Sequence, residues 1–337
     1  MFRLDLRLMS FRAMATIAIV SPGAMGAGIA KRLSDAGCRV LSILSGRSTS
    51  SRRRAAEAGM HDASLAQIVC EADWVLSILP PDRAEPFVRD FLNAIESIGE
   101  DVTLPVFVDC NAKNPETAIR FARLFSSSSK SASGRVVFLN ASIVGLPPEG
   151  THVPTFYASA ERNPMDQRAL EKFATLAQHG LRVKLLTGDS ADVRDASALK
   201  MSFSGIMKGM VGLYEIMILA AHTHSPAIAD ALLNEMRSSL PNDLAFIDKY
   251  VPQSFDKAYR FVREMEEMAG FVRGHINVET KEAGTTNVNE VGQIYDGLAS
   301  LFQRLSESAD GGGYMHKDGS SDVDVLRNFA EGAHKAA

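Results

Sequence analysis

The sequence has few cysteines, and no two of them lie close together. Its 337 residues contain only 3 cysteines, Cys38, Cys70 and Cys110, and none belongs to a CxxC motif. Neither a zinc site nor a disulfide framework is therefore indicated, and a reducing compartment such as the cytoplasm is the simpler expectation.

An excess of positive charge is absent as well. The chain has 36 Lys and Arg residues against 40 Asp and Glu, for a formal net charge of -4. This balance argues against nucleic acid or an acidic membrane surface as the partner. No uninterrupted apolar run reaches the roughly 18–20 residues that a membrane-spanning helix needs. His222 and His224 form an HxH pair without further ligands nearby, so no metal site is predicted.

Residues 1–14 precede the first predicted element. They contain Arg3, Arg7 and Arg12 but only one acid, Asp5. An Arg-containing, acid-poor start is one form of mitochondrial transit segment. The alternative, which the short length and scarcity of serine favour, is an extension before the fold of a cytoplasmic protein.

The residues from 15 to 189 alternate between apolar β-branched runs and helical periodicity, which predicts βαβ units and an α/β domain with a doubly wound, mostly parallel sheet. The predicted strands are residues 15–21, 39–45, 73–80, 105–111 and 135–144. This order of elements is typical of a Rossmann domain.

Helix-forming residues dominate from residue 190 onward, which predicts an all-α domain over residues 190–309. The segment 197–222 is apolar nearly all round, so it should be one long buried helix. Pro226, Pro241 and Pro252 mark breaks between later helices. The glycine-rich stretch after Asp310 predicts a loose tail over residues 310–337.

A glycine-containing turn follows the first predicted strand and opens the first helix. Such turns let the backbone approach a pyrophosphate, and the helix N-terminus attracts its charge. The predicted coenzyme-binding residues of this turn are Pro22, Gly23, Ala24, Met25 and Gly26. An ordinary strand–helix turn is the alternative interpretation.

The end of the second predicted strand distinguishes NADP from NAD. An NAD site usually has Asp or Glu there, whereas this chain has Arg47, Ser48 and Thr49. A guanidinium beside hydroxyl groups suits a 2′-phosphate, which favours NADP. A solvated basic turn is the alternative, and the run Arg52–Arg54 is expected to be partly surface.

The stretch IAIVSPGAMGAGIAKRLSDAGCRV resembles the start of the β-hydroxyacid dehydrogenase family, which includes 6-phosphogluconate dehydrogenase, 3-hydroxyisobutyrate dehydrogenase and the imine reductases. Met25-Gly26 and Ala36-Gly37 match the family pattern, while Ser21 stands in place of its first glycine. The variant loop is most similar to the 6-phosphogluconate-dehydrogenase-like branch whose helical C-terminal domain is of the DUF1932 type.

The resemblance extends to three loops and implies roles for them. Leu79 and Pro80 lie in LSILPP, which resembles the loop that passes over the coenzyme. Asn111 occupies the family's position beside the nicotinamide ribose. The segment FLNASIVGLPPEG resembles the substrate loop, with Ser142, Val144 and Gly145 as candidate substrate residues. Val144 replaces a serine that in the family normally holds the substrate carboxylate, which argues against a standard hydroxy acid as the substrate.

The stretch ALKMSFSGIMKG resembles the family's interdomain helix with its catalytic lysine. Lys200 matches that lysine, and Ser204, the second candidate catalytic residue, stands where an asparagine is expected and could donate a hydrogen bond to the substrate or to the lysine. Helical spacing places Lys208 on the same side, as a candidate substrate residue. An apolar setting lowers the pKa of a lysine, which would let Lys200 act as general acid or base. The alternative is a lysine that extends from a helix edge into solvent.

Together these features predict an NADP-dependent oxidoreductase that transfers hydride between the nicotinamide and a small hydroxy acid or keto compound. The alternatives are an NADPH-dependent imine reductase and a non-catalytic NADPH-binding protein. The resemblance also implies a homodimer joined through the helical domains.

Overall fold

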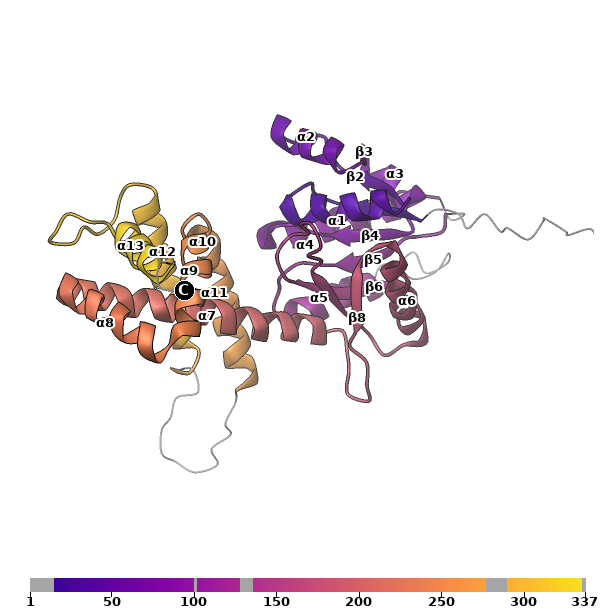
Figure 1. The fold of residues 1–337 in the computed structure, drawn as a ribbon. Coiled ribbons are helices and arrows are strands. Elements are labelled where there is room, and N and C mark those ends of the chain that lie inside the picture. The colour runs from indigo at the N-terminus through magenta and orange to yellow at the C-terminus, as the bar shows by residue number, and fades with distance from the viewer. Residues whose placement is uncertain (1–14, 100–101, 128–135, 277–289, 335–337) are drawn as a thin grey trace, which may run out of the picture. The chain divides into compact units, whose positions relative to one another are not determined.

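The computed structural model describes residues 15–99, 102–127, 136–276 and 290–334 (Figure 1). The predicted extension over residues 1–14, and with it the expectation about a transit segment, lies outside these residues. The chain divides into two compact units, residues 1–200 and 201–337. The predicted boundary after residue 189 lies in the loop before the long helix α7 (Asp195–His224), whose first turns belong to the first unit.

The first unit is built on one eight-stranded sheet with the order β3-β2-β1-β4-β5-β6-β7-β8. Neighbouring strands are parallel except β6 and β7, which form an antiparallel pair. The predicted α/β Rossmann fold is therefore confirmed. The strands are β1 (Thr16–Ile19), β2 (Arg39–Ser42), β3 (Met60–Asp62), β4 (Trp74–Ser77), β5 (Val106–Asp109), β6 (Phe138–Val144), β7 (Thr155–Ala160) and β8 (Arg182–Leu185).

Helices cover both faces of this sheet, because alternate side chains of each buried strand enter two separate apolar cores. One core contains side chains of α1, α2 and α6, and the other contains side chains of α3, α4 and α5. These helices are α1 (Ala24–Asp35), α2 (Thr49–Glu57), α3 (Leu65–Glu71), α4 (Pro81–Glu96), α5 (Pro115–Ser127) and α6 (Pro164–Ala174), and a short 3₁₀ helix follows at Thr175–His179.

Three strands were not predicted, and each has a weak sequence signal. β3 has only three residues, and two of its side chains are exposed. β8 alternates exposed and half-buried side chains, and β7 contains two alanines and a serine among its six residues. Short or weakly apolar segments of this kind pair only because the neighbouring strand offers an open edge.

The second unit is helical over its described residues. Pro226, Pro241 and Pro252 each occupy the first turn of a helix, where a missing N–H costs nothing. The predicted breaks therefore occur at these prolines. The helices are the remainder of α7, α8 (Pro226–Ser239), α9 (Pro241–Tyr250), α10 (Pro252–Phe255), α11 (Ala258–His275), α12 (Gln293–Ala309) and α13 (Asp322–His334).

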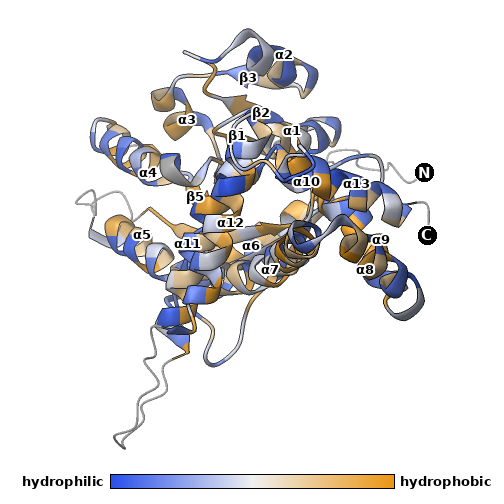
Figure 2. Ribbon diagram, turned by 90° about the vertical axis from the view of Figure 1, so that its left-hand side faces the viewer, coloured by the Kyte–Doolittle hydropathy of each residue, from blue (hydrophilic) through white to orange (hydrophobic). Residues whose placement is uncertain are grey.

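Helix α7 has the expected length and apolar composition, visible as the extensive orange colour along it in Figure 2. It is not buried all round, however. Its exposed apolar side chains are Phe203, Ile206, Leu213, Ile216 and Met217. Helix α7 is long and apolar enough to cross a membrane, a property that it shares with core helices of soluble proteins. Glu215 on the same helix is fully buried beside Ser254, as in a protein core.

The prediction of a loose tail over residues 310–337 is wrong for its second half. Residues 322–334 form α13, which buries Val325, Leu326 and Phe329. The glycines near residue 312 suggested a flexible end, but the apolar residues beyond them repeat at helical spacing and pack into the unit.

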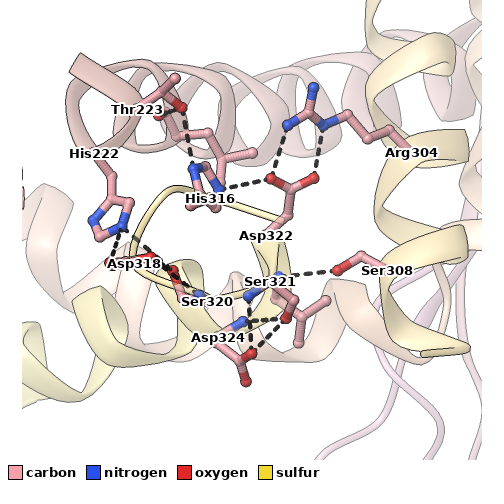
Figure 3. A network of polar contacts seen from close by, with 12 residues as sticks. His222, Thr223, Arg304, Ser308, His316, Asp318, Ser320, Ser321, Asp322 and Asp324 are labelled. Atoms are coloured by element: carbon pink, nitrogen blue, oxygen red, sulfur yellow. Dashed lines mark hydrogen bonds and ion pairs between the residues drawn. The ribbon is translucent and has the colours of Figure 1, made fainter. Parts of the chain in front are cut away.

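Polar contacts fix the segment before α13 as well (Figure 3). Asp322 is fully buried and accepts two hydrogen bonds from Arg304, at 2.6 and 2.9 Å. His316 contacts Asp322 at 2.9 Å through Nε2 and Thr223 at 3.3 Å through Nδ1. His222 pairs with Asp318, and among the described residues no group of three or more His, Cys, Asp or Glu could hold a metal ion.

We expect Asp322→Asn to lower the free energy of unfolding by about 2–3 kcal/mol, because Arg304 and His316 lose the charge that pairs with them inside the unit. Urea unfolding followed by circular dichroism measures the change. Glu331→Gln, at an exposed position on the same helix, is the matched control and should have little effect. Equal free energies of unfolding in the two variants would show that the pairing of Asp322 with Arg304 and His316 does not stabilise the unit.

Candidate functional site

The two glycines of the turn between β1 and α1 have different structural roles. A Cβ atom on Gly26 would lie 2.2 Å from the carbonyl oxygen of Ser21, so only glycine fits there. Gly23 is the N-cap of α1 with φ of -64°, and a Cβ atom on it would meet nothing within 4 Å. Gly26 therefore allows the turn to form, whereas Gly23 leaves open space at the helix N-terminus.

The same turn is held by an arginine that the sequence indicated only as partly surface. Arg54 on α2 donates a hydrogen bond from Nη1 to the carbonyl oxygen of Pro22 at 2.9 Å. The first turn of α1 contains no acidic residue, and no side chain caps it. The positive end of the helix dipole is thus available to an anion beside Gly23.

Arg47, Ser48 and Thr49 lie between β2 and the first turn of α2. Arg47 is half-buried, with Nε at 3.5 Å from the carbonyl oxygen of Ile43, and it has no ion pair among the described residues. Ser48 is the N-cap of α2 and accepts a hydrogen bond from the N–H of Ser51. Ser48 therefore has a structural role of its own, whereas the guanidinium of Arg47 has few internal contacts.

The loop between β4 and α4 is positioned by the predicted residue Asn111, in an arrangement that the sequence did not indicate. Its Oδ1 accepts a hydrogen bond from the N–H of Leu79 at 2.6 Å. Its Nδ2 donates to Ser77 Oγ at 3.0 Å and to the carboxylate of Asp109. The Asn111 amide is thus engaged inside the protein, where it holds Leu79 beside the exposed Pro80.

Asp109 is an unexpected member of this group. It lies at the carboxyl end of β5 and is 1% exposed. Burial raises the pKa of its carboxyl to about 7, while the contact with Asn111 acts in the opposite direction. No motif distinguishes this aspartate, and only the fold brings it beside Ser77.

The predicted substrate residues lie at the carboxyl end of β6. Ser142 is buried, and its Oγ has no hydrogen-bond partner within the described structure. Val144 is half-buried, and Gly145 has φ of +126°, a conformation that favours glycine. The loop after Gly145 reaches α1, since a Cβ atom on Gly28 would lie 2.7 Å from Pro148 Cδ.

Lys200 belongs to the same unit as this strand. Its Nζ donates a hydrogen bond to the carbonyl oxygen of Ile143 at 2.8 Å, and no carboxylate forms an ion pair with it among the described residues. Burial lowers its pKa from 10.5 to about 8. A carbonyl oxygen supplies no full charge to stabilise the ammonium ion, so the neutral amine is accessible near neutral pH.

The two other predicted residues of α7 lie in the second unit. Ser204 is buried. Lys208 forms an ion pair with Glu264 of α11, and its ammonium lies 4.8 Å from the centre of the Phe261 ring. These contacts give Lys208 a structural role, and the substrate role that helical spacing suggested has no support from them.

The residues of the first unit converge because of the strand order. β1 lies between β2 and β4, so the connections from the sheet centre leave in opposite directions at β1 and β4. In open α/β sheets, ligands bind at the carboxyl ends of strands beside such a switch point. The turn at Gly23 follows β1 and the loop at Leu79 follows β4, and the side chains of Asp109 and Ser142 occupy the ends of the next two strands.

Two parts of this chain match known family models, and the whole chain resembles solved structures. Residues 13–98 match the family model of the acetohydroxy acid isomeroreductase NADPH-binding domain, and residues 223–305 match the domain of unknown function DUF1932. The Mycobacterium tuberculosis 3-hydroxyisobutyrate dehydrogenase, solved with L-serine, aligns with a TM-score of 0.58 over 94% of this chain and 99% of its own, at 14% identity. This chain has the 3-hydroxyacid dehydrogenase fold.

Two further solved structures are similar to this chain. The conserved protein MTH1747 of unknown function, described as structurally similar to 3-hydroxyacid dehydrogenases, has a TM-score of 0.58 and 23% identity, covering 85% of this chain and 98% of its own. A conserved hypothetical protein from Sinorhizobium meliloti 1021 has a TM-score of 0.61 and 20% identity, covering 97% and 98%. No curated protein matches the sequence. The resemblance predicted from the sequence, including the DUF1932 type of the helical part, is confirmed.

The lowered pKa of Lys200 has a consequence for stability. In the unfolded chain this lysine has an ordinary pKa of about 10.4. Between pH 8 and 10.4 the unfolded chain therefore binds more protons than the folded chain. The free energy of unfolding consequently rises with pH over that range. We expect Lys200→Met to raise the free energy of unfolding at pH 7 by about 1–2 kcal/mol, a value reduced for the partial exposure of the side chain.

Urea unfolding at pH 7 and pH 10 tests this expectation. The gain should shrink at the higher pH, because the wild-type lysine is then neutral in the folded state. Lys172→Met, at an exposed position on α6, is the control and should show no such dependence. A loss of stability in Lys200→Met at both pH values would contradict a lowered pKa.

Proposed function

We propose that this protein is an NADP-dependent oxidoreductase that transfers hydride between the nicotinamide and a small hydroxy acid or keto compound. The observation that carries the proposal is an amine with a pKa of about 8, Lys200, held at the carboxyl end of β6 in the unit that contains the glycine turn. A group that titrates near neutral pH can both accept and donate a proton during turnover.

A dinucleotide fits the residues of the first unit. Open space beside Gly23, an uncapped helix N-terminus and the turn at the switch point are the features that hold a pyrophosphate. The match of residues 13–98 to an NADPH-binding domain supports the same assignment. When bound, the nicotinamide coenzyme accepts or supplies the hydride.

The preference for NADP is supported by the charge at the end of β2. No acid is present at residues 45–49 to bind a free ribose hydroxyl, and the first turn of α2 contains none either. Arg47 has no ion pair among the described residues, so its guanidinium is able to bind a phosphate bidentately. Thr49 and Ser48 offer hydroxyl groups beside it.

Lys200 would transfer the proton that accompanies the hydride. In alcohol oxidation the neutral amine accepts the hydroxyl proton, and in ketone reduction the ammonium ion returns a proton to the same oxygen. The hydrogen bond to Ile143 O orients the side chain and leaves further positions on Nζ for a substrate oxygen.

The substrate loop favours a substrate whose polar group is small. Ser142 has a buried hydroxyl without a partner among the described residues, whereas Val144 offers no hydrogen bond in place of the family's serine. A keto or hydroxyl oxygen requires fewer donors than a carboxylate. Val144 also favours the second candidate, an imine reductase, since an imine has no carboxylate to be held.

The homodimer expected from the family is retained as part of the proposal. Phe203, Ile206 and Leu213 expose large apolar surfaces on one long helix, and a second copy of the chain would cover them.

We expect Arg47→Ala to weaken NADPH binding at least tenfold while NADH binding changes little, because the variant loses the pairing with the 2′-phosphate. Calorimetric titration with both coenzymes measures the two affinities. Arg53→Ala, at an exposed position on α2, is the matched control. Equal losses for NADPH and NADH would contradict the assignment of Arg47.

A second variant tests the coenzyme turn without disturbing the fold. Gly23→Ala meets no neighbour and has an ordinary φ, so its melting temperature should equal that of the wild type. Its methyl group would occupy the space reserved for the pyrophosphate, and the affinity for both coenzymes should fall. Unchanged affinity would place the coenzyme elsewhere.

We expect Lys200→Met to reduce turnover by about 10²-fold or more while NADPH still binds, because the proton transfer is lost. The assay follows NADPH absorbance with 3-hydroxy acids, 2-keto acids and cyclic imines, and Lys172→Met is the control. Retained turnover would remove Lys200 from the mechanism. Activity with cyclic imines alone would favour the imine reductase.

A further inference from the structure

A cluster of buried polar side chains ties the start of α7 to the sheet. Asn140 on β6 and Ser159 on β7 are direct neighbours across the antiparallel pair, and both are 0% exposed. Asn140 Nδ2 donates to the carbonyl oxygen of Val193 at 2.8 Å and to Ser197 Oγ at 2.9 Å. Ser159 Oγ donates to the same carbonyl at 3.0 Å and accepts from the N–H of Ala196 at 3.1 Å.

These four hydrogen bonds, which we call the β6–β7 clamp, fix the helix start in a specific direction. The carbonyl oxygen of Val193 accepts two of them and so uses both of its lone pairs. The N–H of Ala196 belongs to the first turn of α7, where no helical partner exists for it. Apolar side chains in place of Asn140 and Ser159 would bury the same area but would not fix the direction in which α7 begins.

The clamp and Lys200 lie on one side of α7. Ala196 and Ser197 precede Lys200 by four and three residues, the spacing at which side chains share a helix face. Lys200 Nζ returns to β6 itself, at Ile143, three residues beyond Asn140 on that strand. Strand β6 therefore holds the first turns of α7 at two points, the clamp and the lysine.

We propose that Asn140 and Ser159 are positioning residues that determine where the amine of Lys200 lies and therefore how it reacts. The inference rests on the proposed function only in expecting that a displaced Lys200 amine would slow turnover. If the clamp is lost, the helix start can move relative to β6, the bond from Nζ to Ile143 O is no longer enforced, and the amine reaches more water. Its protonation should then approach that of an ordinary lysine.

The test measures the reactivity of the lysine directly and needs neither substrate nor coenzyme. The full-length protein is treated with trace acetic anhydride at pH values from 6 to 11, and mass spectrometry compares the acetylation of Lys200 with that of the exposed Lys172. The variants are Ser159→Ala, which removes two of the four bonds, and Asn140→Leu, which removes both amide donations without adding a charge near Lys200. Ser159→Thr keeps the hydroxyl and should behave as the wild type.

Ser42→Ala is the control for removal of a buried serine hydroxyl from the sheet outside the clamp. Ser42 is also a fully buried serine of the same sheet, but its hydroxyl has no partner within the described residues and it lies on β2. The melting temperature of every variant is recorded, so that the labelling of Lys200 can be compared among proteins that are all folded at the assay temperature.

We expect the pH midpoint of Lys200 labelling to rise by roughly 0.5–1 unit in Ser159→Ala and Asn140→Leu, and to stay unchanged in Ser159→Thr and Ser42→Ala. A lowered melting temperature with an unchanged midpoint in both clamp variants would overturn the proposal and leave the clamp a purely stabilising contact. If Asn140→Leu does not fold, Ser159→Ala decides alone.

The outcome is separable from the proposed function. A midpoint that moves in a protein without any NADPH-dependent turnover would support the clamp and contradict the oxidoreductase. Turnover that requires Lys200, with a midpoint that stays the same in the clamp variants, would support the oxidoreductase and contradict the clamp.

Discussion

The order of the strands determines where every candidate side chain of the first unit lies. Because β1 is flanked by β2 on one side and β4 on the other, the chain leaves the centre of the sheet in two directions. The two loops that result, at Gly23 and Leu79, begin at the carboxyl ends of the neighbouring strands β1 and β4, and no connecting helix separates them. A sheet with the same strands in sequential order would not bring these loops together.

Both units contain buried ionisable side chains whose pKa values are shifted by burial. Asp109 and Lys200 have pKa values displaced toward neutrality by burial, one upward and one downward. In the helical unit, burial also raises the pKa of Glu215 to about 8, although Ser254 donates a hydrogen bond to it at 2.5 Å. Such groups lower stability and persist where they have a structural or chemical use.

The sequence predicted the parts of the fold whose signal is local. The first strand, the turn at Gly26 and the helix after it are encoded in consecutive residues, and the proline at the start of each of three helices is equally local. Helix α13 was missed because the preceding glycines were given more weight than the periodic apolar residues after them. The ion pair between Arg304 and Asp322, which fixes that segment, joins two helices and has no local signature.

For the candidate site, residue identity was predictable but the contacts were not. Lys200 was identified from the resemblance of its helix to the family, and Arg47 from its position after the second predicted strand. Asn111 was expected to face the coenzyme, yet its amide is engaged with Leu79 and Ser77. Asn140 and Ser159 look like ordinary polar residues in two strands, and only the folded structure shows that they meet the same carbonyl oxygen.

The approach of Pro148 to Gly28 couples the β6–β7 hairpin to helix α1. The hairpin beyond β6 rests directly on the helix that follows the glycine turn, with no room for even one methyl group between them. A β6–β7 hairpin taken from a relative would therefore fit this chain only if residue 28 remained glycine or the hairpin were shortened. Under the proposed function, a change in this hairpin would alter both substrate range and coenzyme affinity, because the hairpin packs directly against the helix that follows the glycine turn.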